Sequence, residues 1–395
     1  MEHIQLPDLA SPAFKANPYP YYARLRVQAP VFRIRAMFGL TAWLITRYDD
    51  VFRVLKDEMF ANNWTPKMPF PLRRAKPLTR HMLTADPPDH TRLRTLVQKA
   101  FTPRMVERLR ERIHAVCAGL LDAAQSRGEM DVVADYALPL PLTVIGELLG
   151  IPVEDRLRFH SWSRSSISAS RRLDFLRAWP DLWLFYRHLR KLIAARRSEP
   201  RDDLISALVQ AEEAGDKLNE DELQAMSVLL LIAGYETTVN LIASGTLALL
   251  QNPEQARLLR DEAAVAEPAV EELLRFTSPL DIASVRMAKA DVALDGVTVR
   301  RGDLVLAAVG SANRDESQFP DPDTLNLVRS PNKHLALGQG AHFCLGAPLA
   351  RLEGAIALTM LWQRFPNLRL AQPATNLRWR RSFALRGLEE LPVML

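Results

Sequence analysis

The chain contains very little cysteine: of its 395 residues, only Cys117 and Cys344 are cysteines. Two cysteines cannot form the disulfide framework of a small secreted protein, and they fit a reducing intracellular compartment. Cys117 lies in a stretch with helical spacing, ERIHAVCAGLLDAA, where a thiol behaves as a small core side chain. Cys344 is therefore the cysteine that is left for chemistry.

Long apolar runs are also missing from the sequence. The N-terminus, MEHIQLPDLASP, has no basic start followed by a long apolar run. No later stretch offers about 18 consecutive uncharged apolar residues, the length of a membrane span. We therefore expect a cytoplasmic protein that makes no membrane contact.

A strong charge imbalance is missing too. The formal net charge is +5 with a pI near 9.3, but the basic residues are scattered among acids and no nucleic-acid-binding module is present. A basic docking face for an acidic protein partner fits better than nucleic acid, although any single Arg or Lys is usually solvated surface. Hydrophobic residues make up 48% of the chain, enough for a large core, and the length alone leaves the domain count open.

Glycines surround Cys344 in residues 337–351, LGQGAHFCLGAPLAR. Gly338, Gly340 and Gly346 allow positive φ and leave open space around the sulfur. The apolar helix predicted to follow points its free N–H groups and positive dipole end at the sulfur, which favours the thiolate. No second cysteine or close histidine pair completes a zinc site, so the simplest interpretation is one axial ligand to haem iron. The alternative is a buried structural thiol.

A second unusual stretch is a predicted helix of about thirty residues that starts after Asn219 and ends at Leu250. Asn219 is a good N-cap with Glu222 at the third helical position, and Gln-Asn-Pro ends the helix. A helix that is apolar on nearly every side must run through the middle of the protein. Its centre is interrupted by residues 233–238, AGYETT.

This interruption carries local costs, since a mid-helix Gly costs about 1 kcal/mol relative to Ala and a Glu among leucines needs a partner. Leu230, Ala233, Gly234 and Thr237 share one face, so small residues are expected to leave a gap beside a hydroxyl. The gap would admit a diatomic ligand, with Thr237 as hydrogen-bond donor and Glu236 as proton source. The alternative is a kink in which Thr237 bonds back to the carbonyl four residues earlier.

Taken together, the two stretches closely resemble the cytochrome P450 family. The Ala-Gly-x-Glu-Thr motif is similar to that family's oxygen-activation motif. The cysteine stretch resembles its haem-ligand loop at Gly338, Gly340, His342, Cys344, Gly346, Leu349, Ala350 and Arg351. Two positions differ. Leu337 replaces the usual Phe, which is expected to change the electronic environment of the iron, whereas Tyr235 replaces the His of many bacterial members and is expected to matter little.

The resemblance also assigns roles to basic residues elsewhere. A His and an Arg after Asp-Pro-Pro bind a haem propionate in the family, which implies His90 and Arg94, and Arg286 matches a second propionate-binding arginine. Glu272 and Arg275 match the Glu-x-x-Arg pair that is buried in the family and holds the loop before the cysteine. Solvated surface is the ordinary alternative for each of these residues.

The substrate pocket is the part of the site that the sequence defines least. In the family, the proline-rich segment between Phe60 and Pro88 covers the substrate, and a loop tip near 382–384 enters the pocket. Simple packing is the alternative for each candidate. The candidate pocket residues are Trp64, Met68, Phe70, Met82, Leu230, Ala233, Ile282 and Phe383.

The resemblance runs from about Asn17 to the C-terminus and implies a mainly α fold with a smaller β-rich region. We expect one domain over residues 1–395, with the β-rich part at approximately 30–50 and 280–310, and a monomer. Haem b (iron protoporphyrin IX) would lie between the Cys344 loop and the Gly234–Thr237 segment. Ala233, Gly234, Gly338, Gly346 and His342 would complete its surroundings.

The implied reaction is monooxygenation, in which one oxygen atom of O2 enters a C–H bond or an alkene of an apolar organic substrate. Similarity to bacterial macrolide and polyketide hydroxylases suggests a bulky secondary metabolite. A separate ferredoxin-type donor, reduced by an NAD(P)H-dependent reductase, would dock near Arg92 and Arg104. Two alternatives remain: a peroxide-driven enzyme, whose known relatives usually lose the acid and threonine, and a haem sensor or carrier, which has no use for Glu236 and Thr237.

Overall fold

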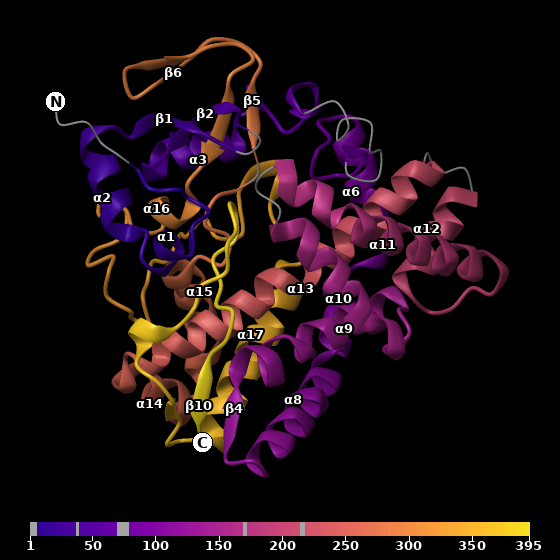
Figure 1. The fold of residues 1–395 in the computed structure, drawn as a ribbon, viewed down its shortest axis with the longest axis vertical. Helices are drawn as coiled ribbons and strands as arrows, with labels where there is room; N and C mark the ends of the chain where they lie inside the picture. The colour runs from indigo at the N-terminus through magenta and orange to yellow at the C-terminus, as the bar shows by residue number, and fades with distance from the viewer. Residues whose placement is uncertain (1–5, 37–38, 69–78, 169–171, 214–217, 284) are drawn as a thin grey trace.

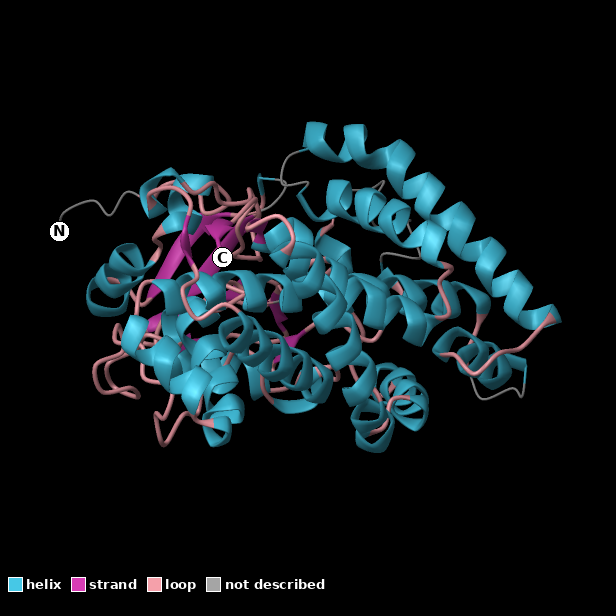
Figure 2. Cartoon of the chain, turned by 90° about the horizontal axis from the view of Figure 1, so that it is seen from below, coloured by secondary structure: helices cyan, strands magenta, loops and turns pink. Residues whose placement is uncertain are grey.

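The computed structural model describes residues 6–36, 39–68, 79–168, 172–213, 218–283 and 285–395. Helices dominate it, as predicted (Figures 1 and 2). The helices of the N-terminal half are α1 (Pro12–Ala16), α2 (Tyr19–Gln28), α3 (Tyr48–Lys56), α6 (Asp89–Ala100), α7 (Pro103–Arg108), α8 (Arg110–Gln125), α9 (Pro139–Leu149), α10 (Val153–Ser168) and α11 (Arg172–Ser198). Those of the C-terminal half are α12 (Leu204–Glu213), α13 (Glu220–Leu250), α14 (Pro253–Asp261), α15 (Ala266–Thr277), α16 (Val309–Ala312) and α17 (Ala347–Arg364).

The strands form three small sheets, and Figure 1 shows β1, β2, β5 and β6 near the top of the molecule and β4 and β10 near the bottom. The largest has the order β1-β2-β8-β5-β3, and a second has the order β4-β10-β9, while β6 pairs only with β7. The strands are β1 (Val31–Arg35), β2 (Thr41–Ile45), β3 (Phe60–Ala61), β4 (Glu129–Asp131), β5 (Arg286–Ala288), β6 (Val292–Leu294), β7 (Val297–Val299), β8 (Leu304–Ala307), β9 (Arg369–Leu370) and β10 (Pro392–Met394).

The largest sheet unites two segments that are far apart in the sequence. β1 and β2 pair antiparallel, with Val31 opposite Ile45, and β2 pairs parallel to β8, with Ala42 opposite Leu304. This sheet therefore joins residues 31–45 to residues 286–307, the two regions predicted to be β-rich. The described residues between 105 and 213 are mostly helical, as predicted, with the short strand β4 and a π-helical turn at Val132–Ala137 among them.

Helix α13 runs through the centre of the molecule (Figure 1). Its predicted capping box is present: Asn219 Oδ1 accepts from the N–H of Glu222 at 3.0 Å, and a Glu222 carboxylate oxygen accepts from the N–H of Asn219 at 3.1 Å. The helix ends at Leu250, and α14 begins at Pro253, as predicted. Helices α9, α11, α12, α14, α15 and α17 all pack against it, so its apolar surface is covered on most sides.

Two helical stretches, Val132–Leu149 and Glu220–Leu250, are long and apolar enough to cross a membrane by length and composition alone. Neither stretch is uncharged, since the first contains Asp135 and Glu147 and the second contains Glu236, so the expectation that no run of about 18 uncharged apolar residues occurs is not contradicted. In each helix, 67% of the apolar window is buried inside the protein. The core helix of a soluble protein passes the same test, so burial within the fold accounts for both stretches.

Candidate functional site

The loop that carries Cys344 depends on glycine at defined positions. Gly338 and Gly340 have φ of +74° and +69°, which side chains with a Cβ rarely adopt. A Cβ on Gly340 would also lie 3.2 Å from the Cα of Lys56, at the end of α3. The N–H of Cys344 donates to the carbonyl of Leu337 at 2.8 Å, which closes the loop. Helix α17 follows at Ala347, slightly later than predicted.

The N–H groups at the start of α17 lie near the Cys344 sulfur, as predicted, but burial of the sulfur has the larger effect on the pKa of the thiol. Burial raises the pKa of the thiol above its usual value. The N–H groups of Gly346 and Ala347, together with the positive charges of Arg94 and Arg351, act in the opposite direction. The helix start therefore does favour the thiolate, as predicted, without outweighing the burial of the sulfur.

Four basic side chains predicted to contact haem come together in the structure. His90 from α6 and His342 from the cysteine loop stack, with ring centroids 4.0 Å apart. Arg286 from β5 is 4% exposed and donates to the backbone carbonyls of Phe60 and Leu55 at 3.4 and 3.3 Å. Among the described residues, His90 Nε2 and Arg286 Nε are buried and have no hydrogen-bond partner. Unpartnered buried donors are rare and call for an explanation.

The charges in this cluster repel one another. Burial, followed by the charges of His90, Arg286 and Arg94, lowers the pKa of His342 to about 3. Burial also lowers the pKa of Arg286 to about 10, and the pKa values of His90 and Arg94 are lowered for the same first reason. A buried group of cations is stabilised by anions with oxygen acceptors. The cluster therefore fits the two propionates of haem b.

The centre of α13 has an accessible face on an otherwise buried helix. Ala233 is exposed, and Leu230, Gly234 and Thr237 are partly exposed. Thr237 Oγ1 donates to the carbonyl of Ala233 at 3.3 Å, the back-bond that the sequence left open as an alternative. A hydroxyl in this bond still has lone pairs that can accept. Glu236 is 3% exposed and binds Arg380 Nη1 at 3.0 Å.

The structure gives glycine at position 234 a packing role that the sequence did not predict. A Cβ at Gly234 would lie 2.8 Å from Cδ1 and 2.9 Å from Cγ1 of Ile145, on α9. Gly234 therefore allows α9 to pack closely against α13, while it is also partly exposed on the face beside the Thr237 hydroxyl. Among the small residues of that face, Ala233 is the one that lies open.

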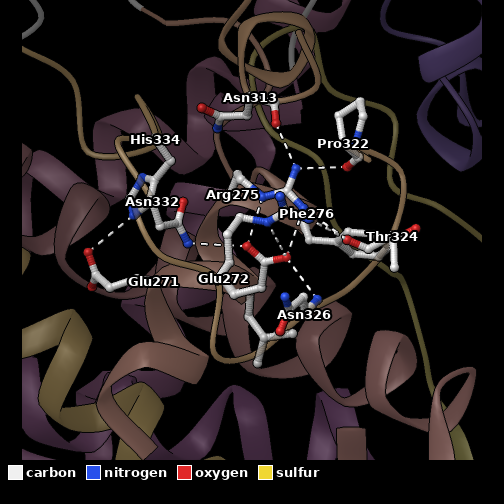
Figure 3. A network of polar contacts seen from close by, with 12 residues as sticks. Glu271, Glu272, Arg275, Phe276, Asn313, Pro322, Thr324, Asn326, Asn332 and His334 are labelled. Carbon is white, nitrogen blue, oxygen red and sulfur yellow. Dashed lines mark hydrogen bonds and ion pairs between the residues drawn. The ribbon is translucent and has the colours of Figure 1, made fainter. Parts of the chain in front are cut away.

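The Glu272–Arg275 pair is fully buried and joins α15 to the chain that leads to the cysteine loop (Figure 3). Arg275 binds both carboxylate oxygens of Glu272 at 2.8 Å. Its remaining hydrogen bonds go to the carbonyls of Asn313, Pro322 and Thr324 at 2.8–3.2 Å. Glu272 in turn accepts from the Asn326 N–H, Arg329 and Asn332 at 3.0–3.2 Å. These bonds fix the segment at positions 313–332, immediately before the cysteine loop.

The candidate pocket residues fall into two groups. Trp64 and Phe383 are partly buried and pack against one cluster with Ile282, whereas Met82 and Leu230 pack against the cluster around α13. Ile282 is only 1% exposed, so it supports this wall from behind and does not face an open space. Met68 is partly buried, and Phe70 lies outside the described residues.

Several residues around the site were not identified from the sequence. Arg380 and His160 both approach Glu236, although they lie 144 and 76 positions away from it. Arg92 was expected on a docking face, but it binds Glu222 at 2.6 and 3.1 Å and is not a free cation. Arg104 is exposed. No local spacing links these partners, so the sequence carried no signal for them.

Comparison with known proteins agrees with this geometry. A family model described as Cytochrome P450 matches residues 9–198 and 184–386. The polyketide biosynthesis cytochrome P450 PksS of Bacillus subtilis is 46% identical over 397 residues, covering 97% of this chain and 96% of that protein. The mycinamicin IV hydroxylase/epoxidase of Micromonospora griseorubida is 44% identical over 376 residues, covering 94% of each. The crystal structure of myxobacterial CYP267B1 in complex with myristic acid superposes with a TM-score of 0.93 at 43% identity, covering 98% and 99% of the two chains.

This chain belongs to the cytochrome P450 family. Its fold is the P450 fold, mainly helical with a smaller sheet region, which confirms the predicted fold class. The protein is a haem-b-dependent oxidoreductase of the monooxygenase class. Its similarity to bacterial biosynthetic members is also confirmed.

Proposed function

We propose that this enzyme inserts one oxygen atom from O2 into a bulky apolar organic molecule, by hydroxylation of a C–H bond or by epoxidation. The observation that carries the proposal is the accessible centre of α13, where Ala233 lies open beside the Thr237 hydroxyl. The neighbouring Glu236 carboxylate is a proton source. Haem bound through the Cys344 thiolate would supply the oxygen activation, because thiolate ligation favours O–O cleavage in P450s generally.

The chain's own residues divide this work. His90, Arg94, Arg286 and His342 would hold the propionates of bound haem through charge-assisted hydrogen bonds. Thr237 Oγ1 holds a proton beside the reacting oxygen, and Glu236 replenishes it. Trp64, Phe383, Met82 and Leu230 exclude water around an apolar substrate. The relatives named for polyketide biosynthesis and mycinamicin oxidation, and the myristic acid complex, support polyketide-like or fatty acyl substrates.

Electrons come from a separate ferredoxin-type protein in the cytoplasm, which is reduced by an NAD(P)H-dependent reductase. Arg104 remains exposed for an acidic partner, and Lys56 at the end of α3 lies directly against the cysteine loop through Gly340. Charge complementarity of this kind speeds the encounter and weakens with salt. The rate of haem reduction by a surrogate ferredoxin should therefore fall as ionic strength rises. This fall should be steeper for the wild-type enzyme than for Arg104→Gln.

The test is reconstituted turnover. Compounds that convert the haem from low to high spin are selected first, with myristic acid as the starting probe. They are then incubated with surrogate ferredoxin, reductase and NAD(P)H under isotopically heavy O2. We expect one labelled oxygen atom per product molecule. In Thr237→Ala, coupled product formation should fall about 10- to 100-fold, within the range of a positioned proton donor, while Thr237→Ser retains most of it.

The alternatives predict different results. A peroxide-driven enzyme would turn over rapidly with hydrogen peroxide and not with NAD(P)H and redox partners. A haem sensor or carrier would bind ligands without forming product in either assay. Undiminished product formation by Thr237→Ala would show that the assignment of Thr237 is wrong.

A further inference from the structure

The carboxylate of Glu236 lies between two basic side chains from distant parts of the chain. Its Oε2 accepts from Arg380 Nη1 at 3.0 Å, in the segment near the C-terminus. Its Oε1 lies 3.8 Å from Nδ1 of His160, on α10. Oε1 is buried and has no hydrogen-bond partner among the described residues. One oxygen is therefore fixed by Arg380, and the other faces an imidazole just beyond hydrogen-bond distance.

His160 is linked to the same turn of α13 through Tyr235. His160 Nδ1 lies 3.0 Å from the hydroxyl of Tyr235, and the two rings meet edge to face at 5.6 Å. Tyr235 is fully buried, whereas the side chain of His160 retains 11% exposure. The Tyr235 side chain extends from α13 far enough for its hydroxyl to contact His160 on α10. It therefore places an imidazole beside Glu236 from a neighbouring helix.

The two basic neighbours of Glu236 differ in what they can deliver. A guanidinium stays protonated at every physiological pH, so Arg380 can orient the carboxylate but cannot give it a proton. An imidazole gains and loses a proton near neutral pH. Of the pair, only His160 can transfer a proton to Glu236 and recover it from solvent.

Several charged or titratable groups described on α9, α10 and α11 have partners other than His160. Glu147 on α9 binds Arg112 and Arg156, and Arg190 on α11 binds Gln224. His188 on α11 stacks against Trp162 and bonds to the carbonyl of Leu184. On α10 itself, Arg158 pairs with Asp155. The contacts of His160 that bear on Glu236 are those with Tyr235 and with the carboxylate itself, and Arg380 lies on the far side of that carboxylate.

We infer that His160 is the proton donor that recharges Glu236, with Tyr235 holding its imidazole in place. The His160 imidazolium gives its Nδ1 proton to Glu236 Oε1 through a small approach of the side chains or a bridging water. Glu236 passes that proton toward Thr237, and solvent reprotonates His160 at its exposed edge. No bond other than these N–H and O–H bonds changes. The inference rests on the proposed function, in which Glu236 supplies protons, and it gives Tyr235 a role that the sequence did not predict.

The test compares His160→Gln with His188→Gln in the holoenzyme, because His188 is a half-buried histidine on the adjacent helix that does not contact Glu236. We expect His160→Gln to lower coupled NAD(P)H-driven turnover about 10- to 100-fold and to remove one limb of its pH profile. Hydrogen peroxide arrives with its own protons, so peroxide-driven turnover should stay within about twofold of wild type. His188→Gln should resemble wild type in both routes. Equal loss in both routes by His160→Gln, or an unchanged pH profile, would overturn the inference.

A second readout does not depend on turnover. In the ferrous carbonyl complex, the imidazole signal of His160 can be assigned by its loss in His160→Gln and titrated by NMR. Replacing Glu236 with Gln removes a carboxylate 3.8 Å away, so the pKa of His160 should fall by about one unit or more. An unchanged pKa would show that the two groups are not coupled. Absence of product from wild type with every redox partner would instead refute the proposed function and leave this titration interpretable.

Discussion

Replacement of Lys15 by Met should destabilise the protein strongly although it removes no apolar contact. Lys15 is 0% exposed, and its Nζ lies 2.6 Å from Asp281 Oδ2 and 3.1 Å from the carbonyl of Phe383. Tyr22 donates to the other Asp281 oxygen at 3.0 Å. Methionine fills the volume of the lysine stem, so the change removes charge without removing apolar contact. The buried Asp281 carboxylate then keeps only the neutral Tyr22 hydroxyl of these two side-chain donors, and the Phe383 carbonyl loses the hydrogen bond from Lys15.

The size of the effect follows from the burial of both partners. Removing one member of a buried ion pair costs about 3–5 kcal/mol, because the other charge remains unpaired. An unfolding entropy of about 2.1 cal/mol/K per residue gives about 0.8 kcal/mol/K for 395 residues. Lys15→Met should therefore lower the thermal midpoint by about 4–6 °C. The double variant Lys15→Met/Asp281→Leu should recover most of this loss, since an apolar replacement of both partners is often nearly neutral.

The assay is differential scanning calorimetry of the four proteins of this cycle at one scan rate. A midpoint for Lys15→Met within about 1 °C of wild type would refute the reasoning, as would a double variant that shows the sum of both single losses. The pocket provides an independent readout, because Lys15 supports the backbone that carries Phe383. Myristic acid should bind Lys15→Met more weakly, as measured by the spin-state change of the haem, while the ferrous carbonyl spectrum stays that of thiolate-ligated haem.

Three further predictions concern the site. Gly234→Ala should lower stability by about 1 kcal/mol in urea unfolding despite better helix propensity, because its Cβ overlaps Cδ1 and Cγ1 of Ile145; Ile145→Val in the same chain removes only Cδ1 and should relieve part of that loss. Leu337→Phe should shift the haem reduction potential in a redox titration, since it places an aromatic ring near the thiolate; an unchanged potential would remove the significance of this position. Burial acts to raise the pKa of Glu271, but hydrogen bonds from Arg351 and His334 lower it to about 2. A carboxyl group with a depressed pKa contributes its full stabilisation above the ordinary value of 4.5 and loses it as pH falls toward the folded-state value. The difference in thermal midpoint between wild type and Glu271→Gln should therefore shrink as pH falls from 4.5 toward about 2. A difference that persists at the lower pH would contradict the assignment.

The features that could be predicted from the sequence are those that depend on neighbouring positions. The capping box of α13 joins residues three apart, and Glu272 and Arg275 are also three apart on one helix. The glycines around Cys344 act on their own backbone. Each of these constraints is local, so a short pattern in the sequence contains it. The positions of α13 and of the segment before the cysteine loop could therefore be inferred before the fold was known.

The features that could not be predicted join residues that are far apart in the chain. Lys15 and Asp281 are 266 positions apart, and Glu236 and Arg380 are 144 apart. The packing role of Gly234 was not predicted because its neighbour, Ile145, belongs to another helix. A buried charge states that a partner exists but not where it lies. The sequence therefore showed that Glu236 needed a partner, and only the fold identifies Arg380 and His160.

Many of these unpredicted contacts involve one segment, residues 380–386. Arg380 binds Glu236, the carbonyl of Phe383 accepts from Lys15, and Arg386 donates to the carbonyls of Lys15 and Thr277 at 2.8 and 3.1 Å. No helix lies in this stretch, so many of its polar groups bond to distant elements, although the N–H of Leu385 donates to Ser382 Oγ within the segment. The same segment, through the side chains of Arg380 and Arg386 and the carbonyl of Phe383, thus contacts the acid of α13 and the N-terminal helix, and it carries the candidate wall residue Phe383. Because such a segment has no periodicity, a sequence pattern cannot reveal it, and yet it connects the proposed proton source to the proposed substrate wall.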